Sequence, residues 1–266
     1  MPELPEVETV KRELTQAIVG KKIDGVIINN AKVIRQNNPK DFLEGLKGLS
    51  VKGVLRKGKL LIIELSNGKA LAIHLKMTGQ LVYPGDGLKS RVSFKFSDGK
   101  FMDFRDQRLF GELCLVSNWK DLKFVKALGP EPFDLTQDKF RQMLLEKNSK
   151  IKTLLLDQSF VSGIGNLYAA EALFRAKIHP ERKASSLAEK EASALLKEIK
   201  DTLSEAIKYK GSSIDQYVQL DGQRGEYVKF HKVYGRQGKP CLICKMPIKR
   251  ISLGGRGTYF CPRCQK

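Results

Sequence analysis

The sequence predicts a multidomain α+β protein of 266 residues, and three features along the chain predict it. A helical pattern opens the chain, and strand-like segments follow it as far as about Val116. Helical patterns then dominate beyond the punctuated linker Gly129–Pro132. The last segment, Lys229–Lys266, holds four of the five cysteines and ten Lys/Arg residues with no Asp or Glu.

The N-terminal half is expected to form an antiparallel sandwich or barrel with one helix. Apolar residues recur at helical spacing over the first twenty residues, and Gly20 ends that pattern. Asn67-Gly68 and Asp98-Gly99 are hairpin-turn signals between later segments. Strands are expected at Ile23–Ile28, Val51–Leu55, Leu60–Leu65, Lys69–Leu75, Val92–Phe96, Lys100–Phe104 and Glu112–Val116.

The middle segment is expected to be helical. Its longest pattern places Leu195, Ile199 and Leu203 along one stripe, which is typical of a helix with one buried face. Phe160–Gly165 is a short glycine-containing turn between two of the helices. Helices are expected at about Thr136–Lys147, Lys150–Gln158, Asn166–Ala176, Leu187–Tyr209 and Ile214–Leu220.

The cysteine spacing predicts a zinc site. Cys241-x-x-Cys244 is followed, after sixteen residues, by Cys261-x-x-Cys264, which fits two CxxC knuckles around one metal ion. Four thiolates would complete a tetrahedral coordination sphere, so the zinc would be structural. A redox dithiol pair is the alternative. The residues between the knuckles, Ile251–Phe260, read as a hairpin whose tip carries Arg256, otherwise an exposed loop cation.

The chain carries 48 Lys+Arg and 29 Asp+Glu, a formal charge of +19. Such an excess favours an anionic partner, and nucleic acid is the leading candidate because neutralising phosphates releases counterions. An anionic membrane surface is the alternative. No apolar stretch is long enough for a membrane span, and no secretory signal is visible, so we expect a cytosolic protein.

The N-terminus offers a candidate nucleophile. Removal of Met1 before a small residue would leave Pro2 with a free secondary amine, part of which is neutral at physiological pH. A neutral amine can attack an electrophilic carbon, and Glu3 could move a proton beside it. The alternative is that Glu3 only favours the positive end of the first helix.

Several motifs in order along the whole chain resemble bacterial formamidopyrimidine-DNA glycosylases, also called 8-oxoguanine-DNA glycosylases. Leu4 favours this branch over the related endonuclease VIII branch, which usually has Gly there. The motifs are Pro2–Thr9, Arg56–Leu61, Ile73–Gly79, Asp106–Gly111, Leu128–Pro132, Gly163–Tyr168, Ile178–Pro180, Val233–Arg236 and the four-cysteine finger.

The resemblance implies a catalytic β-sandwich domain over residues 1–130, a helix-two-turns-helix domain over 131–232 and a zinc finger over 233–266. It implies a bifunctional glycosylase and abasic-site lyase that flips damaged purines out of double-stranded DNA, in the bacterial cytosol at the nucleoid. Nothing suggests an oligomerisation seam, so a monomer is expected. The implied cofactor is one structural Zn²⁺, held by Cys241, Cys244, Cys261 and Cys264.

Roles carry over to individual residues by the same resemblance. Pro2 matches the nucleophile, Glu3 the acid/base group and Lys59 a phosphate-contacting hairpin lysine that would otherwise be a solvated charge. The trio Met77, Arg108 and Phe110 matches the residues that fill the gap left by the flipped base; core packing would otherwise be expected for Met77 and Phe110. The expected phosphate-binding residues are His74, Lys152, Asn166 and Arg256.

The expected lesion pocket involves Glu6, for which a plain surface role is the alternative, together with Tyr217 and Tyr227. These tyrosines lie in the segment 212–232, which corresponds to a loop that closes on the flipped base. Asn166 would also fit a helix N-cap after Gly165.

Departures from the family pattern are modest. Position 60 is Leu where an aromatic residue is frequent, and Gln107 and Leu109 replace the commoner Pro and Arg. Two other functions fit parts of the sequence: a catalytically silent DNA-binding protein on the same fold, and a zinc-ribbon protein that binds RNA or the ribosome. Retained Met1 would favour the silent binder, and equal binding of RNA and damaged duplex DNA would favour the RNA binder.

Overall fold

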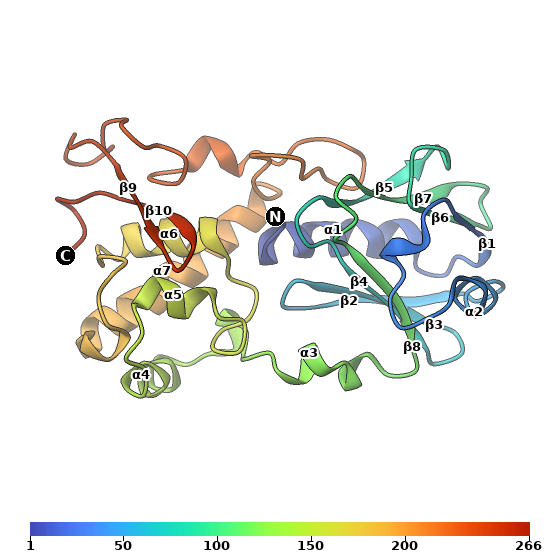
Figure 1. Cartoon of the computed structure of the whole chain (residues 1–266), viewed down its shortest axis with the longest axis horizontal. Helices are drawn as coiled ribbons and strands as arrows, with labels where there is room; N and C mark the ends of the chain where they lie inside the picture. The colour runs from blue at the N-terminus through green and yellow to red at the C-terminus, as the bar shows by residue number, and fades with distance from the viewer. The chain divides into compact units, whose positions relative to one another are not determined.

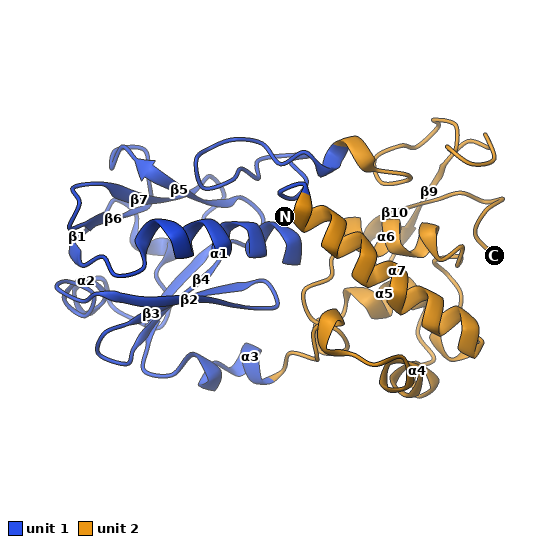
Figure 2. Ribbon diagram, turned by 180° about the vertical axis from the view of Figure 1, so that it is seen from behind, with its two compact units in different colours: residues 1–126, 209–228 blue, residues 127–208, 229–266 orange.

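The computed structural model describes all 266 residues, which pack into two compact units (Figure 2). Unit 1 comprises residues 1–126 and 209–228, and unit 2 comprises residues 127–208 and 229–266. Residues 209–228 therefore pack with the N-terminal part of the chain, although they follow the helices in sequence. The division into three contiguous domains at residues 130 and 232 stays a prediction, since the compact units are a different, discontinuous grouping.

Unit 1 contains a β-sandwich with an N-terminal helix, as predicted (Figure 1). Its strands are β1 (Ile23–Ile28), β2 (Val51–Lys57), β3 (Leu60–Leu65), β4 (Ala70–His74), β5 (Gly79–Gly85), β6 (Val92–Phe96), β7 (Phe101–Asp106) and β8 (Glu112–Val116). Its helices and 3-10 turns are α1 (Leu4–Ile18), η1 (Ala31–Val33), α2 (Pro39–Glu44), η2 (Trp119–Asp121) and α3 (Lys123–Lys126). One antiparallel sheet has the order β1-β6-β7-β5, and the other has the order β2-β3-β4-β8.

The apolar stripe of α1 explains why this helix joins the sandwich. Val7, Val10, Leu14 and Ile18 are all buried in the core cluster that also contains residues of β2 and β3. Burying each such side chain stabilises the fold by about 1.5–3 kcal/mol before entropy is counted. The helix therefore holds its first turn, which carries the predicted catalytic residues, on a packed scaffold.

The strand β5 is not among the strands that the sequence predicts. Its residues Gly79–Gly85 begin and end with glycine and include Pro84, all of which are disfavoured inside strands. The strand forms because it pairs antiparallel with β7, where Leu81 lies opposite Phe104 and both are buried in the core. Pairing at this edge of the sheet thus outweighs the local sequence preference.

Unit 2 is mainly helical. Its elements are η3 (Pro132–Asp134), α4 (Gln137–Leu145), α5 (Ile151–Leu156), α6 (Asn166–Arg175), η4 (Ala184–Ser186), α7 (Glu189–Lys208), β9 (Lys249–Leu253) and β10 (Arg256–Phe260), and η5 (Tyr227–Phe230) spans the boundary of the two units. The strands β9 and β10 form the predicted hairpin. Gly254 and Gly255 at its tip have φ of +56° and +71°, which suits a two-residue turn with both central residues left-handed.

The helix expected at Ile214–Leu220 is wrong, because this segment is irregular. Side chains bond its backbone in place of a helical ladder: Glu13 accepts the N–H of Leu220 at 2.9 Å, and the Ser213 hydroxyl donates to the carbonyl of Tyr217 at 2.7 Å. The first of these partners is about 200 residues away in sequence. A local pattern therefore could not predict it. No helix in the structure combines the length and apolar character that crossing a membrane requires.

Candidate functional site

The predicted catalytic and lesion-pocket glutamates lie at the start of α1, and both are buried. Glu3 is the N-cap residue and is 5% exposed, and Glu6 is 3% exposed. One oxygen of Glu6 accepts the N–H of Glu3 at 2.7 Å, and the other accepts the N–H of Ser212 at 2.9 Å. Glu6 is therefore not a surface residue: its carboxylate joins the first turn of α1 to the segment 209–228. Pro2 precedes this turn and is itself buried.

Lys59 lies in the two-residue turn at the tip of the β2–β3 hairpin and is only 8% exposed, so it is not a solvated surface charge. Arg56 fastens this tip to α1: it donates to Glu8 at 2.9 Å and to the carbonyl of Gly58 at 2.9 Å. Burial alone would raise the pKa of Glu8, but the hydrogen bonds from Arg56 and Arg12 outweigh it and hold that pKa below its ordinary value. The hairpin that carries Lys59 is thus held against the helix that begins at Glu3.

His74 ends β4 and is half-buried. Burial, followed by the charges of Lys76 and Lys59, lowers its pKa to about 3, so the ring is neutral near pH 7. Its Nδ1 accepts the N–H of Lys76 at 3.0 Å. A backbone N–H can only donate, so the proton of the neutral ring sits on Nε2, which is then a hydrogen-bond donor.

The structure brings Met77, Arg108 and Phe110 together on two exposed turns. Arg108 lies over the ring of Phe110, with its guanidinium carbon 4.5 Å from the ring centroid, and its Nη1 is 3.4 Å from the sulfur of Met77. Met77 is 39% exposed and Phe110 is 47% exposed. Core packing therefore does not explain either residue, and an exposed apolar pair flanking a cation suits insertion into a base stack.

The predicted lesion-pocket tyrosines are both buried in unit 1. The hydroxyl of Tyr217 donates to the carbonyl of Lys210 at 3.1 Å, and the N–H of Tyr227 donates to the carbonyl of Gly211 at 2.9 Å. Burial, followed by the nearby charge of Glu6, raises the pKa of Tyr217 well above its ordinary value, so the phenol stays neutral. The two tyrosines thus hydrogen-bond the backbone carbonyls of two consecutive residues, Lys210 and Gly211.

Gly211 is a position where only glycine fits. Its φ is +78°, and a Cβ there would lie 2.9 Å from Oε1 of Glu6 and 3.0 Å from the ring of Tyr217. Gly222 has a similar φ of +86° but no heavy atom within 4 Å of such a Cβ. Alanine at Gly222 would therefore add backbone strain alone, whereas alanine at Gly211 would add backbone strain and a steric clash.

We expect Gly211→Ala to lower the free energy of unfolding by about 2–5 kcal/mol, because left-handed strain and overpacking both contribute. Gly222→Ala is expected to cost only about 1–2 kcal/mol, from strain alone. Urea unfolding followed by circular dichroism measures both losses. Equal losses would contradict the close approach of Gly211 to Glu6.

Unit 2 brings three of the predicted phosphate-binding positions to one place. Lys152 is 1% exposed; its ammonium group donates to Oδ1 of Asn166 at 2.6 Å and to the hydroxyl of Thr258 at 2.8 Å. Asn166 donates to the carbonyl of Gly257 at 3.1 Å, next to the exposed Arg256 at the start of β10. Gly165, not Asn166, is the N-cap of α6, so the capping alternative for Asn166 is wrong.

Two residues that the sequence does not predict support this group. The hydroxyl of Tyr234 lies 3.5 Å from the side-chain amide of Asn166. Glu171 is fully buried in α6 and accepts the backbone N–H groups of Lys232, Val233 and Tyr234 at 2.8–3.0 Å. Burial raises the pKa of Glu171, although these hydrogen bonds oppose the rise. The motif Val233–Arg236 is the only sequence signal for Tyr234, and no local pattern indicates Glu171.

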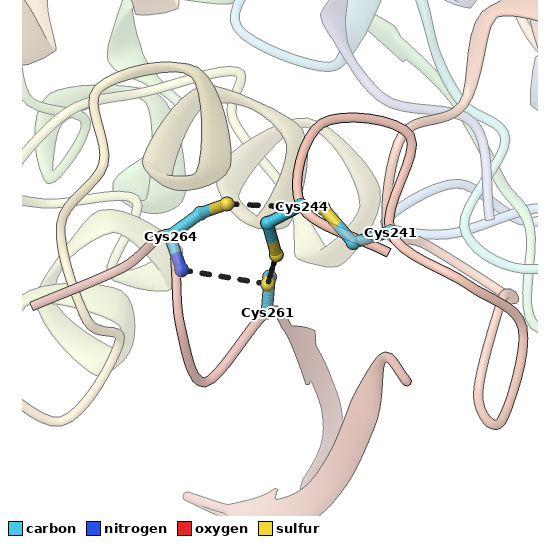
Figure 3. A group of neighbouring side chains, drawn as sticks. All are labelled: Cys241, Cys244, Cys261 and Cys264. Carbon is cyan, nitrogen blue, oxygen red and sulfur yellow. Dashed lines mark hydrogen bonds between the residues drawn. The ribbon is translucent and has the colours of Figure 1, made fainter. Parts of the chain in front are cut away.

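The four predicted metal ligands form one cluster (Figure 3). Their sulfur atoms all lie within 4.8 Å of one another, with Cys241 and Cys264 3.8 Å apart and Cys244 and Cys261 3.4 Å apart. A tetrahedral zinc ion with bonds of about 2.3 Å separates its sulfurs by about 3.8 Å. The geometry therefore fits one structural zinc ion, and four convergent thiols do not fit an isolated redox pair.

These features define a class of zinc-finger α+β proteins that combine a helix-led β-sandwich with a helical unit. Residues 1–113 match the formamidopyrimidine-DNA glycosylase N-terminal domain, residues 128–218 match the H2TH domain of the same proteins, and residues 238–266 match the zinc finger found in FPG and IleRS. The chain belongs to the formamidopyrimidine-DNA glycosylase family.

Individual relatives cover the whole chain. It is 43% identical to formamidopyrimidine-DNA glycosylase of Pelotomaculum thermopropionicum and 40% identical to that of Listeria innocua, in each case over 100% of this chain and at least 99% of the relative. The crystal structure of the MutM (FPG) protein from Thermus thermophilus superimposes with a TM-score of 0.90 at 37% identity, covering 99% of this chain and 98% of that one. A Lactococcus lactis FPG variant bound to Fapy-dG-containing DNA gives a TM-score of 0.91 at 38% identity, with 100% of both chains covered.

Proposed function

We propose that this protein is a base-excision repair enzyme that removes oxidised and ring-opened purines from double-stranded DNA. The buried Pro2-Glu3 start of α1, in a chain similar over its whole length to formamidopyrimidine-DNA glycosylases, carries the proposal. The relative from Lactococcus lactis was solved with DNA containing Fapy-dG, which supports ring-opened purines as substrates. We further propose three domains, 1–130, 131–232 and 233–266, a monomeric state and a cytoplasmic location.

The proposed reaction begins once Met1 is removed. The lone pair of the Pro2 nitrogen attacks C1′ of the flipped nucleotide, the bond from C1′ to the base breaks, and the proton that the nitrogen loses passes by way of Glu3 to the departing base. Glu3 supplies a proton to the ring oxygen of the sugar, so that the ring opens and a covalent iminium forms. Loss of a C2′ proton then expels the 3′ phosphate, and a second elimination expels the 5′ phosphate.

Other residues would hold the DNA around that reaction. Lys59, the Nε2–H donor of His74, Asn166 and Arg256 would bind phosphates, and Lys152 would act through Asn166, whose amide oxygen it holds. Met77 and Phe110 would fill the gap in the stack, while Arg108 would hydrogen-bond the base left unpaired. Glu6, Tyr217 and Tyr227 would shape the lesion pocket. The bound zinc would supply the structural order of the β9–β10 finger and no chemistry.

Borohydride trapping tests the proposal. Protein lacking Met1, incubated with duplex DNA containing 8-oxoguanine opposite cytosine, is expected to form a covalent adduct after reduction, seen as a slower band on a denaturing gel. Undamaged duplex and single-stranded RNA are the controls, at one stated salt concentration. Protein that retains Met1 should form no adduct, because its Pro2 nitrogen is an amide. The absence of any adduct with the Met1-free protein would overturn the proposal.

A further inference from the structure

Two glutamine side chains fasten the segment 212–217 to the β-sandwich within unit 1. The side-chain amide of Gln80, in β5, donates to the backbone carbonyl of Gln216. The side-chain amide of Gln216 in turn donates to Oε1 of Gln107 at 2.6 Å. We name these three residues the glutamine bridge. Its two anchors are neighbours in the sheet: Gln80 lies in β5, which pairs with β7, and Gln107 directly follows β7.

One end of the bridge belongs to the turn that carries Arg108 and Phe110. Gln107 lies between Asp106 and Arg108. The buried carboxylate of Asp106 fixes this turn: it accepts the N–H of Gly111 at 2.7 Å and the N–H of Arg108 at 3.2 Å. The backbone on either side of Gln107 is thus held in place, and the segment 212–217 cannot move away from this turn without breaking the bond to the Gln107 side chain.

The two attachments of the segment differ in strength. At Ser212 the acceptor is the buried carboxylate of Glu6, and hydrogen bonds to charged groups are stronger than those between neutral groups. At Gln216 the partners are neutral, and Gln107 is exposed. A hydrogen bond between neutral, partly solvated groups contributes less to stability than one to a charged group. Within the segment 212–217, the attachment at Gln216 is therefore the weaker of the two.

The bridge also borders a polar cavity of about 520 Å³. Gln80, Gln107 and Gln216 form part of its wall together with Thr78 and Arg105. The Nε of Arg105 is buried and has no hydrogen-bond partner in the structure. Breaking the bond between Gln216 and Gln107 would therefore alter the wall of this cavity and would also free the chain next to Tyr217.

We propose that Gln107 is a positioning residue, which holds the segment 212–217 against the turn that carries Arg108 and Phe110. This inference rests on the proposed function, in which that turn fills the gap in the DNA, and on the family resemblance, which implies that the segment 212–232 closes on the flipped base. Through the glutamine bridge, the filling of the gap in the DNA and the closing of the segment on the flipped base depend on each other. A proline, the commoner family residue at position 107, has no side-chain oxygen to accept this bond.

Hydrogen exchange of the free Met1-free protein tests the bond itself. In Gln107→Ala, the amides of Gln219 and Leu220, which donate to Gln223 and to Glu13, are expected to exchange about three- to tenfold faster than in the unsubstituted chain. Gln107→Glu keeps an acceptor and should exchange as the unsubstituted chain does. Gln16→Ala, an exposed glutamine of α1, is the matched control. Unchanged exchange in β3 shows that the fold is intact.

Single-turnover base excision tests the positioning role. Gln107→Ala is expected to lower the excision rate about three- to tenfold while its affinity for duplex DNA containing an abasic-site analogue stays the same. Gln107→Ala and Gln216→Ala should not add, because they remove one bond. Unchanged exchange in Gln107→Ala overturns the bridge, and faster exchange with unchanged excision overturns the positioning role. If the unsubstituted chain excises nothing, the proposed function fails, and the exchange result still decides whether the bridge holds the segment.

Discussion

Glu3→Gln is expected to lower the single-turnover rate of base release by about 10²- to 10⁴-fold, the usual contribution of a positioned acid/base group. Glu3 is buried at the N-cap of α1, directly after Pro2. Glutamine has nearly the same shape and still offers an oxygen acceptor, but its amide cannot give up or take up a proton at neutral pH. We therefore expect the local fold and the affinity for abasic-analogue DNA to change little.

The same variant separates acid/base chemistry from nucleophilic attack. An abasic site has already lost its base, and the Pro2 amine is unchanged in Glu3→Gln, so borohydride should still trap this variant on abasic DNA. Glu44→Gln, an exposed glutamate of α2 in the same unit, is the control and should release the base at the normal rate. Normal base release by Glu3→Gln would remove Glu3 from the mechanism.

Local sequence patterns predict most of the sandwich because they depend on neighbours in the chain. The strands β1, β3, β6 and β8 have the predicted bounds, and Gly68 and Gly99 have the positive φ that their hairpins require. The two failures have a common cause. The strand β5 and the irregular segment at 214–220 both depend on partners distant in sequence, namely β7 and Glu13. Periodicity carries no information about such partners.

The candidate site also has features that local sequence predicts and features that it cannot predict. Cysteine spacing alone predicts the metal cluster, because each CxxC turn places two thiolates close enough to bind one ion and the separation of the two turns is typical of zinc sites. The burial of Lys59, Glu6 and Lys152 could not be predicted, since these residue types are normally exposed. Their burial is informative for that reason: a charged side chain is held inside only with compensating partners, such as Asn166 and Thr258 around Lys152.

Cys244→Ser is expected to release the zinc ion and to unfold the finger at residues 238–266. A structural zinc site contributes about 10–16 kcal/mol of apparent binding free energy, which is folding free energy for so small a segment. Removing one thiolate leaves an incomplete coordination sphere. The loss should spread within unit 2, because Cys241 and Cys261 pack in one cluster with Ala170 and Phe174 of α6. The β-sandwich of unit 1 has its own core and should stay folded.

DNA affinity is expected to fall about tenfold or more in Cys244→Ser, because the finger carries the exposed Arg256 and also supplies Thr258, which holds Lys152 and through it Asn166. Zinc content by metal analysis, hydrogen exchange in β3 and in β10, and DNA titration at fixed salt measure the three consequences. Leu242→Ala is the matched control, since Leu242 is exposed between the two knuckle cysteines and offers no ligand. Zinc retained at full stoichiometry would contradict the four-thiolate site. Loss of zinc with unchanged affinity would instead show that the finger does not contribute to DNA binding. The hairpin supplies Gly257 and Thr258 to the network around Asn166, so its unfolding would break that network.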